Sequence, residues 1–161
     1  MSSFTLKRFT LSDIPDVAVD QTVAHMRRLA IMDAHSPEFK SLARKLRGKT
    51  KMETAKNMFD WVVKNIQYEH DPPEYEYITR PKALLQKRKE DCDGMATLLA
   101  TLFKTVGIEC YFKVIAWRIQ NFTHVYLTAK LSNKGWSPID PVLKIFGQQK
   151  DGIKRHKIYK V

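Results

Sequence analysis

The sequence contains little cysteine, and Cys92 and Cys110 are the only two thiols among its 161 residues. A small disulfide-stabilised domain needs more, so we expect reduced cysteines and a reducing compartment. No apolar run reaches the length of a membrane span, and the first residues lack the charged-then-apolar pattern of a signal peptide. We therefore expect a cytoplasmic protein without membrane contact.

Patterns for binding metals and phosphates are also missing. The histidines His25, His35, His70 and His156 are scattered, and no Cys or His pair has the spacing of zinc ligands. The six glycines form no phosphate-binding loop. The sequence therefore predicts neither a metal nor a cofactor.

Positive charge is plentiful, with 28 Lys and Arg against 17 Asp and Glu and a formal net charge of +11. The basic residues gather at 40–56, 80–89 and 150–160. Such surfaces fit an acidic partner, which includes nucleic acid, an anionic cell-wall polymer or an acidic protein face, but they also occur as plain solvated surfaces. Because no aromatic stripe is interleaved with the basic residues, no motif supports nucleic-acid binding.

Length and an apolar content of 43% indicate one domain over residues 1–161, with a real core. Helical spacing and capping residues predict an N-terminal helical part at about 13–89. The core follows at about 90–143, and a basic C-terminal strand at about 150–161. Helices followed by a helix packed on an antiparallel sheet make the predicted class α+β.

Several local signals divide the helical part. Asp20 is a candidate N-cap of a helix that ends near Ala34, Ser36 before Pro37 begins the next, and Thr50 begins a third with Glu53 in a capping box. The first twelve residues read as extended, either as an edge strand or as an arm. Residues 69–80 read as a loop, followed by a short helix at 81–89.

The core begins at Asp91, a predicted N-cap that places Cys92 in the first turn of an apolar helix. Gly107 ends this helix, where a left-handed cap is least costly. Strands are then predicted at 108–117, 123–131 and 136–139. His124 therefore begins a strand, and Asp140 follows the end of the next one.

A thiol, an imidazole and a carboxylate in this order fit a nucleophile, its base and the group that orients the base. Each residue alone also has a structural interpretation, since Cys92 is a small hydrophobe, His124 a strand residue and Asp140 a turn residue before a proline. The helix start favours a Cys92 thiolate, whereas the neighbouring Asp91 and Asp93 oppose it. Cys110 shares a strand face with apolar residues and is interpreted as a core thiol.

These residues resemble the transglutaminase-like superfamily of papain-like thiol enzymes over roughly residues 50–143. The similarity lies in Asp-Cys-Asp before the apolar helix, Thr-His-Val on a strand, Trp-x-Pro-Ile-Asp-Pro, and the helix around Trp61 upstream. The chain looks closest to compact versions from bacteria and tailed phages. Glu90 departs from the glycine usual in the family before Asp-Cys, which affects the expected shape of that loop.

The resemblance implies thiol-dependent acyl transfer on peptide, isopeptide or other amide bonds, with Cys92, His124 and Asp140 as the catalytic triad. It also implies an oxyanion site at the backbone N–H of Cys92, with Tyr68 or Gln67 as the second donor, although Tyr68 also reads as a core aromatic. Hydrolysis is favoured over crosslinking, because crosslinking requires a protected amine site that excludes water.

A second function class stays open, a structural or adaptor protein of a phage particle that keeps the fold without the chemistry. The expected partners are accordingly a peptide or protein substrate, an acidic partner, or a phage assembly component. The expected location is cytoplasmic or virion-associated.

Overall fold

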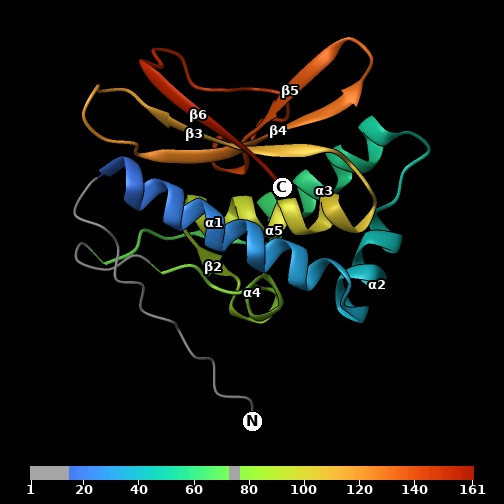
Figure 1. The fold of residues 1–161 in the computed structure, drawn as a ribbon. Helices are drawn as coiled ribbons and strands as arrows, with labels where there is room; N and C mark the ends of the chain where they lie inside the picture. The colour runs from blue at the N-terminus through green and yellow to red at the C-terminus, as the bar shows by residue number, and fades with distance from the viewer. Residues whose placement is uncertain (1–14, 73–76) are drawn as a thin grey trace.

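The computed structural model describes residues 15–72 and 77–161, in which helices cover one face of a four-stranded sheet (Figure 1). The class is α+β, as the sequence predicts. The prediction of an extended segment over the first twelve residues lies outside the described part. No described helix is both long enough and apolar enough to cross a membrane.

The sheet has the strand order β5-β4-β3-β6, and every neighbouring pair is antiparallel. Its strands are β3 (Cys110–Ala116), β4 (His124–Ser132), β5 (Gly135–Ile139) and β6 (Arg155–Lys160). The first three coincide with the predicted strands to within two residues. The C-terminal segment returns to pair with β3, so the basic strand is the sheet edge opposite β5.

Five helices precede or support the sheet. They are α1 (Pro15–Ala34), α2 (Pro37–Leu46), α3 (Lys51–Asn65), α4 (Pro81–Lys87) and α5 (Cys92–Thr105). Three capping predictions are confirmed, because the side chains of Ser36, Thr50 and Asp91 each accept a hydrogen bond from the first turn of the helix that follows. The prediction that Asp20 begins a helix is wrong. The first helix already spans that position from Pro15, and Asp20 instead hydrogen-bonds Lys157 and Tyr159 across to β6.

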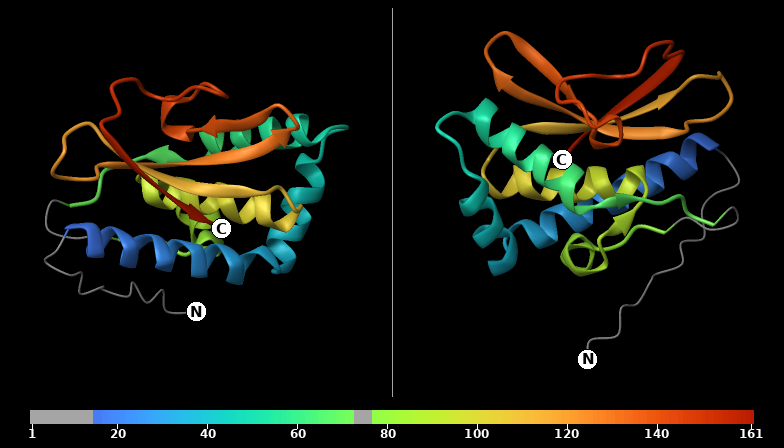
Figure 2. Two further views of the ribbon diagram at one scale, coloured as in Figure 1. Left: turned by 45° about the horizontal axis from the view of Figure 1, so that its top comes forward. Right: turned by 180° about the vertical axis from the view of Figure 1, so that it is seen from behind.

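Helix α5 lies at the centre of the molecule, between the sheet and α1 (Figures 1 and 2). Every residue from Asp93 to Phe103 is buried. The apolar face that the sequence predicts packs on the inward side chains of β3 and β4, which include Phe112 and Leu127. Gly107 follows the helix with φ +73°, the left-handed conformation expected there. This packing fixes the helix start beside one end of the sheet.

A short parallel bridge joins the helical part to the start of α5. Strand β1 (Gln67–Tyr68) pairs with β2 (Lys89–Glu90), and the Gln67 N–H donates to the carbonyl of Arg88 at 2.8 Å. The sequence does not reveal this bridge, because two residues carry no periodicity. The bridge brings Tyr68 beside the residues that precede Cys92.

Candidate active site

Cys92 is the first residue of α5 and lies partly exposed at the helix start. Asp91 is the N-cap, and its Oδ1 accepts hydrogen bonds from the N–H groups of Asp93 and Gly94 at 3.0 and 3.4 Å. The cap therefore satisfies the two amides that follow Cys92 and does not use the amide of Cys92 itself. An amide at this position can bind an anion, because helix N-termini carry partial positive charge.

The surroundings of the thiol favour its neutral form. Burial raises the pKa of Cys92 well above its ordinary value, and the negative charges of Asp93 and Asp91 raise it further. The backbone N–H of Val125 acts in the opposite direction. The thiol also hydrogen-bonds Asp93 Oδ1 at 3.4 Å. The opposing effect of the two aspartates, predicted from the sequence, is thus present in the structure.

His124 and Asp140 form a buried pair at the end of the sheet. His124 begins β4, Asp140 directly follows β5, and the His124 Nε2 lies 2.7 Å from Asp140 Oδ2. The other carboxylate oxygen accepts from the N–H of Val142 at 3.0 Å, so both oxygens have partners. The His124 side chain is 6% exposed and that of Asp140 is fully buried. The carboxylate thus fixes the ring orientation and leaves Nδ1 as the remaining nitrogen.

The structure brings Cys92 close to this pair without joining it to His124. The backbone N–H of Val125, the residue next to His124, lowers the pKa of Cys92, which places the thiol near this residue. The hydrogen bond of the thiol goes to Asp93 and not to the imidazole. In this structure the thiol proton is therefore directed to Asp93 and not to His124.

Two aromatic rings flank the imidazole, and the sequence gave no reason to select them. Trp117 stacks on His124 with ring centroids 5.9 Å apart and an angle of 22°, and Tyr126 lies at the same distance with an angle of 31°. The Trp117 ring is in turn held by the carbonyl of Asp151, which accepts its Nε1–H at 3.0 Å. Both rings thus lie against the imidazole of the His124–Asp140 pair. Only the register between the strands could have indicated that Trp117 and Tyr126 lie beside His124.

The two predicted oxyanion donors lie in β1. Tyr68 is half-buried, and its pKa is raised to about 12, first by burial and then by the charges of Cys92, Asp91, Asp93 and Asp140. Its phenol is therefore protonated near neutral pH and able to donate a hydrogen bond. The Tyr68 hydroxyl lies 3.3 Å from His70 Nδ1. Gln67 is exposed beside it.

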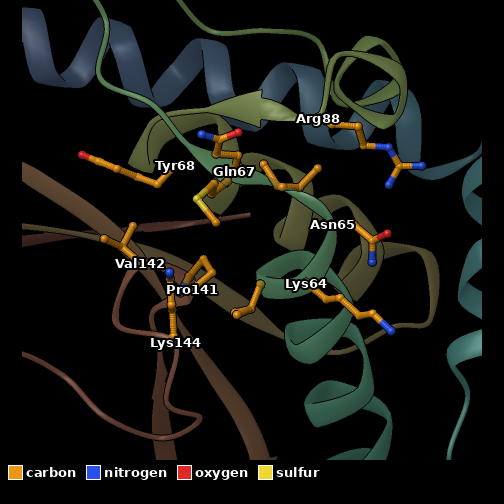
Figure 3. Close-up of a pocket in the computed structure, with 11 residues that line it drawn as sticks. Lys64, Asn65, Gln67, Tyr68, Arg88, Pro141, Val142 and Lys144 are labelled. Carbon is orange, nitrogen blue, oxygen red and sulfur yellow. The ribbon is translucent and has the colours of Figure 1, made fainter.

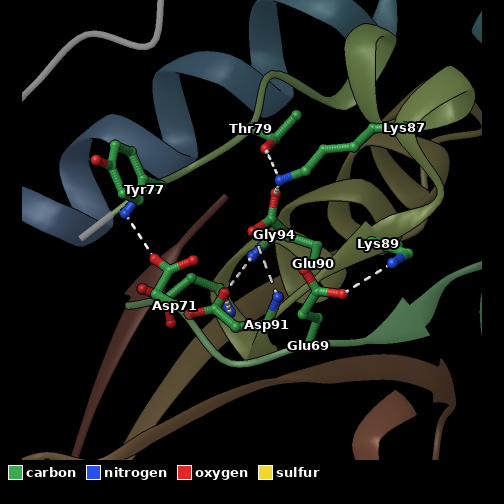
Figure 4. A network of polar contacts seen from close by, with 10 residues as sticks. Glu69, Asp71, Tyr77, Thr79, Lys87, Lys89, Glu90, Asp91 and Gly94 are labelled. Atoms are coloured by element: carbon green, nitrogen blue, oxygen red, sulfur yellow. Dashed lines mark hydrogen bonds and ion pairs between the residues drawn. The ribbon is translucent and has the colours of Figure 1, made fainter. Parts of the chain in front are cut away.

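Glu90, the departure from the family pattern, is buried against the helix start (Figure 4). Lys87 Nζ lies 3.3 Å from Glu90 Oε2 and donates to Thr79 Oγ1 at 3.1 Å. A Cβ on Gly94 would lie 1.9 Å from the Cγ of Glu90. The Glu90 side chain thus occupies the space that the missing side chain at Gly94 leaves open, and the loop closes on the helix through this packing.

Asp91, Cys92 and Asp93 are the one set of ligand atoms that we find close together in the described ranges, all within 4.8 Å of one another. The carboxylate of Asp91 caps the helix, and that of Asp93 accepts the thiol hydrogen bond. Their structural roles are thus met without an ion, and we assign no metal to them.

Comparisons with solved structures show the same fold at low sequence identity. The chain is similar to a presumptive cysteine protease from Cytophaga hutchinsonii (TM-score 0.50, 22% identity, 65% of this chain and 36% of that chain). It is also similar to a presumptive protease from Parabacteroides distasonis (0.60, 14%, 86% and 29%) and to a TGase (0.51, 17%, 91% and 37%). The chain thus spans roughly a third of the length of each of these proteins.

A search of curated proteins finds no match to the sequence. A family model described as the transglutaminase-like superfamily matches residues 40–141, which cover more than half of the chain and include Cys92, His124 and Asp140. The match agrees with the resemblance seen in the motifs and with the fold. The chain belongs to the transglutaminase-like superfamily.

Proposed function

We propose that the protein is a thiol-dependent acyl-transfer enzyme that hydrolyses peptide, isopeptide or other amide bonds. In this proposal Cys92 is the nucleophile, His124 the general base and Asp140 the residue that orients the imidazole. The observation that carries it is the buried contact of 2.7 Å between His124 Nε2 and Asp140 Oδ2. The next residue along the strand, Val125, has a backbone N–H that lowers the pKa of Cys92. A histidine held in this way presents one defined nitrogen.

The reaction begins when the Cys92 thiol turns from Asp93 and gives its proton to His124 Nδ1. The thiolate attacks the substrate carbonyl carbon, and the resulting oxyanion accepts a hydrogen bond from the N–H of Cys92 at the helix start. Tyr68, or Gln67 beside it, supplies the second donor. The imidazolium protonates the leaving amine as the C–N bond breaks, which leaves a thioester on Cys92.

Water then completes the cycle. His124 removes a proton from a water molecule that attacks the thioester, and the carboxylic acid product leaves as Cys92 regains its proton. Hydrolysis is proposed over transfer to an amine because Cys92 is partly exposed, and amine transfer requires that water be excluded from the thioester.

Thiol reactivity tests the proposal, and the second thiol of the chain, Cys110, serves as an internal control. Brief labelling with iodoacetamide near neutral pH, followed by mass spectrometry, should modify Cys92 far faster than Cys110, because Cys92 is partly exposed and has His124 as its proposed base, whereas Cys110 is buried. Equal labelling of both thiols, or faster labelling of Cys110, would contradict an activated nucleophile. It would favour the alternative, a structural or adaptor protein of a phage particle that retains the fold.

Activity is then measured on a peptide mixture with and without an added fluorescent amine. The proposal expects cleaved peptides in the wild type, none with Cys92→Ala, and full activity with Cys110→Ala once its folding has been checked. Incorporation of the amine without cleavage would reverse the assignment from hydrolysis to crosslinking.

A further inference from the structure

A pocket of about 540 Å³ opens beside the candidate active site (Figure 3). Three of its lining residues adjoin site residues. Tyr68 is close enough to Cys92 that a thiolate there would raise the pKa of the phenol, Met95 lies one helical turn after Cys92, and Pro141 follows Asp140. A molecule that reaches Cys92 can therefore extend into this pocket.

The pocket is lined by three cations and by no acidic residue. Lys64 comes from the end of α3, Arg88 from the residue after α4, and Lys144 from the residue after the short 3-10 helix η1 (Pro141–Leu143). Within residues 15–72 and 77–161, none of the three forms an ion pair, although eight other such pairs are present. The guanidinium of Arg88 lies over the Trp61 ring, 5.1 Å from its centroid, which leaves its charge without a counter-ion. Charges of one sign without a counter-ion attract an anion.

The backbone supplies a second, independent observation. Among the described residues, Arg88 and Lys144 are the two non-glycine residues with positive φ, at +62° and +59°. Glycine is the usual occupant of this conformation, since side chains with a Cβ are disfavoured in it. Both residues are C-caps, Arg88 of α4 and Lys144 of η1, and a left-handed residue is a common way to end a helix. Both positions thus carry a long basic side chain where glycine would be more stable.

The rest of the lining indicates what kind of anion fits. Met95 and Val142 present apolar surface, and Asn65 and Gln67 present amides. Inorganic ions have no methylene groups to place on an apolar surface, whereas a glutamate side chain carries two below its carboxylate. The volume also lies within the range of about 300–1,000 Å³ that is usual for sites that bind organic ligands.

We propose that this pocket binds an acidic side chain of the peptide substrate, with Lys64, Arg88 and Lys144 pairing with its carboxylate, so that the enzyme selects acidic sequences next to the bond it cleaves. The inference rests on the proposed function for its link to cleavage. The binding of an acidic peptide is a separate property that does not require the thiol.

Binding is measured first, with Cys92→Ala protein so that no turnover occurs. Fluorescence anisotropy follows a labelled peptide with glutamates on both sides of a glutamine, and a counterpart with glutamine in place of each glutamate. The acidic peptide should bind about tenfold more tightly, since single exposed ion pairs are weak and three act together here. Equal affinities would overturn the proposal.

Charge-matched variants assign the effect to the pocket. Lys64→Glu, Arg88→Glu and Lys144→Glu together should remove the preference for the acidic peptide. The control combines Lys130→Glu, Lys134→Glu and Lys160→Glu, three exposed positions on the sheet and its hairpin, and changes the net charge equally. A similar loss of affinity in both triple variants would show a general charge effect and overturn the pocket assignment.

Lys144→Gly provides the sharpest single variant. It removes one cation and relieves the positive φ, so the affinity for the acidic peptide should fall while the melting temperature stays unchanged or rises. Unchanged affinity with a stable fold would argue against the pocket. Complete competition by inorganic phosphate, or tighter binding of a single-stranded RNA that depends on the same three cations, would reassign it to phosphate groups.

Cleavage then separates failure of the inference from failure of the proposed function. Wild-type protein that cleaves acidic and neutral peptides equally well contradicts the pocket and leaves the enzyme intact. Selective binding of the acidic peptide by a protein with no reactive Cys92 supports the pocket and contradicts the enzyme.

Discussion

The two sides of the site carry opposite charge and are built in different ways. Glu90, Asp91 and Asp93 gather at the start of α5, where they cap the helix, fill the space over Gly94 or accept a hydrogen bond from the thiol. The cations of the pocket lie at the surface of the described structure and form no ion pair there, although the Arg88 guanidinium also lies over the Trp61 ring. The acidic side is therefore part of the fold, whereas the basic side is available to bind a ligand.

Tyr68 marks the boundary between the two sides. It lines the pocket, and its pKa of about 12 reflects the carboxylates on the other side as well as burial. In a chain with a net charge of +11, the acids thus concentrate where they keep a thiol neutral, and unpaired cations lie next to them. Four predictions test this division, from the largest expected effect to the smallest.

The largest effect is expected from Asp140→Asn, which removes the carboxylate that faces His124. An asparagine retains the acceptor for the Val142 N–H but no longer supports an imidazolium. The corresponding change in a serine triad lowers kcat by about 10⁴, and a thiol, which is more easily ionised, should show a smaller but clear loss. Steady-state turnover measures it, together with the pH profile of Cys92 alkylation, which should move upward. Superimposable profiles would indicate that Asp140 is only a turn residue.

The second prediction concerns the packing of the acidic side. Gly94→Ala places a methyl group against the buried Glu90 side chain and should lower the free energy of unfolding by about 1–3 kcal/mol, the usual cost of overpacking. Urea denaturation measures this. In a Glu90→Gly background the same change should be neutral or stabilising, because alanine is the better helix former. An equal cost in both backgrounds would show that the two residues are not coupled.

A smaller effect is expected from Asp93→Asn. It removes a negative charge that raises the pKa of Cys92 and the acceptor that holds the thiol, so the thiolate should form at lower pH. One pKa unit corresponds to a tenfold change, and we expect alkylation near neutral pH to accelerate by about that factor. Asp20→Asn, an acidic position paired with β6, is the control and should leave the rate unchanged. Slower alkylation of Asp93→Asn would contradict the electrostatic account.

The smallest effect concerns ionic strength, which should change the properties of the basic side more than those of the acidic side. Raising the ionic strength screens exposed charges more than buried ones. Affinity for the acidic peptide should therefore fall several-fold between about 0.1 and about 1 M NaCl, whereas the pH at which Cys92 is half alkylated should move little. Equal sensitivity of both quantities would remove the distinction between a buried acidic side and an exposed basic one.

The sequence alone was sufficient to predict those features for which a local residue pattern is compatible with a single local structure. The Asp91 cap, the apolar face of α5 and the alternation at residues 110–114 of β3 and 127–132 of β4 follow from chain stereochemistry and burial alone, and the structure contains each of them. The failure at Asp20 has a physical cause as well. An aspartate at the sixth position of a helix resembles a cap in the sequence, and only the contact with β6 shows its actual partner.

Tertiary structure decided everything that depends on distant segments. The two-residue bridge between β1 and β2, the stacking of Trp117 on His124 and the packing of Glu90 over Gly94 have no local signature. The sequence by itself determined the family, the α+β class and the order of the Cys, His and Asp residues. The folded chain alone decided that the thiol hydrogen-bonds Asp93 and that three separate cations meet in one pocket, because charges and hydrogen bonds act through space and not along the chain.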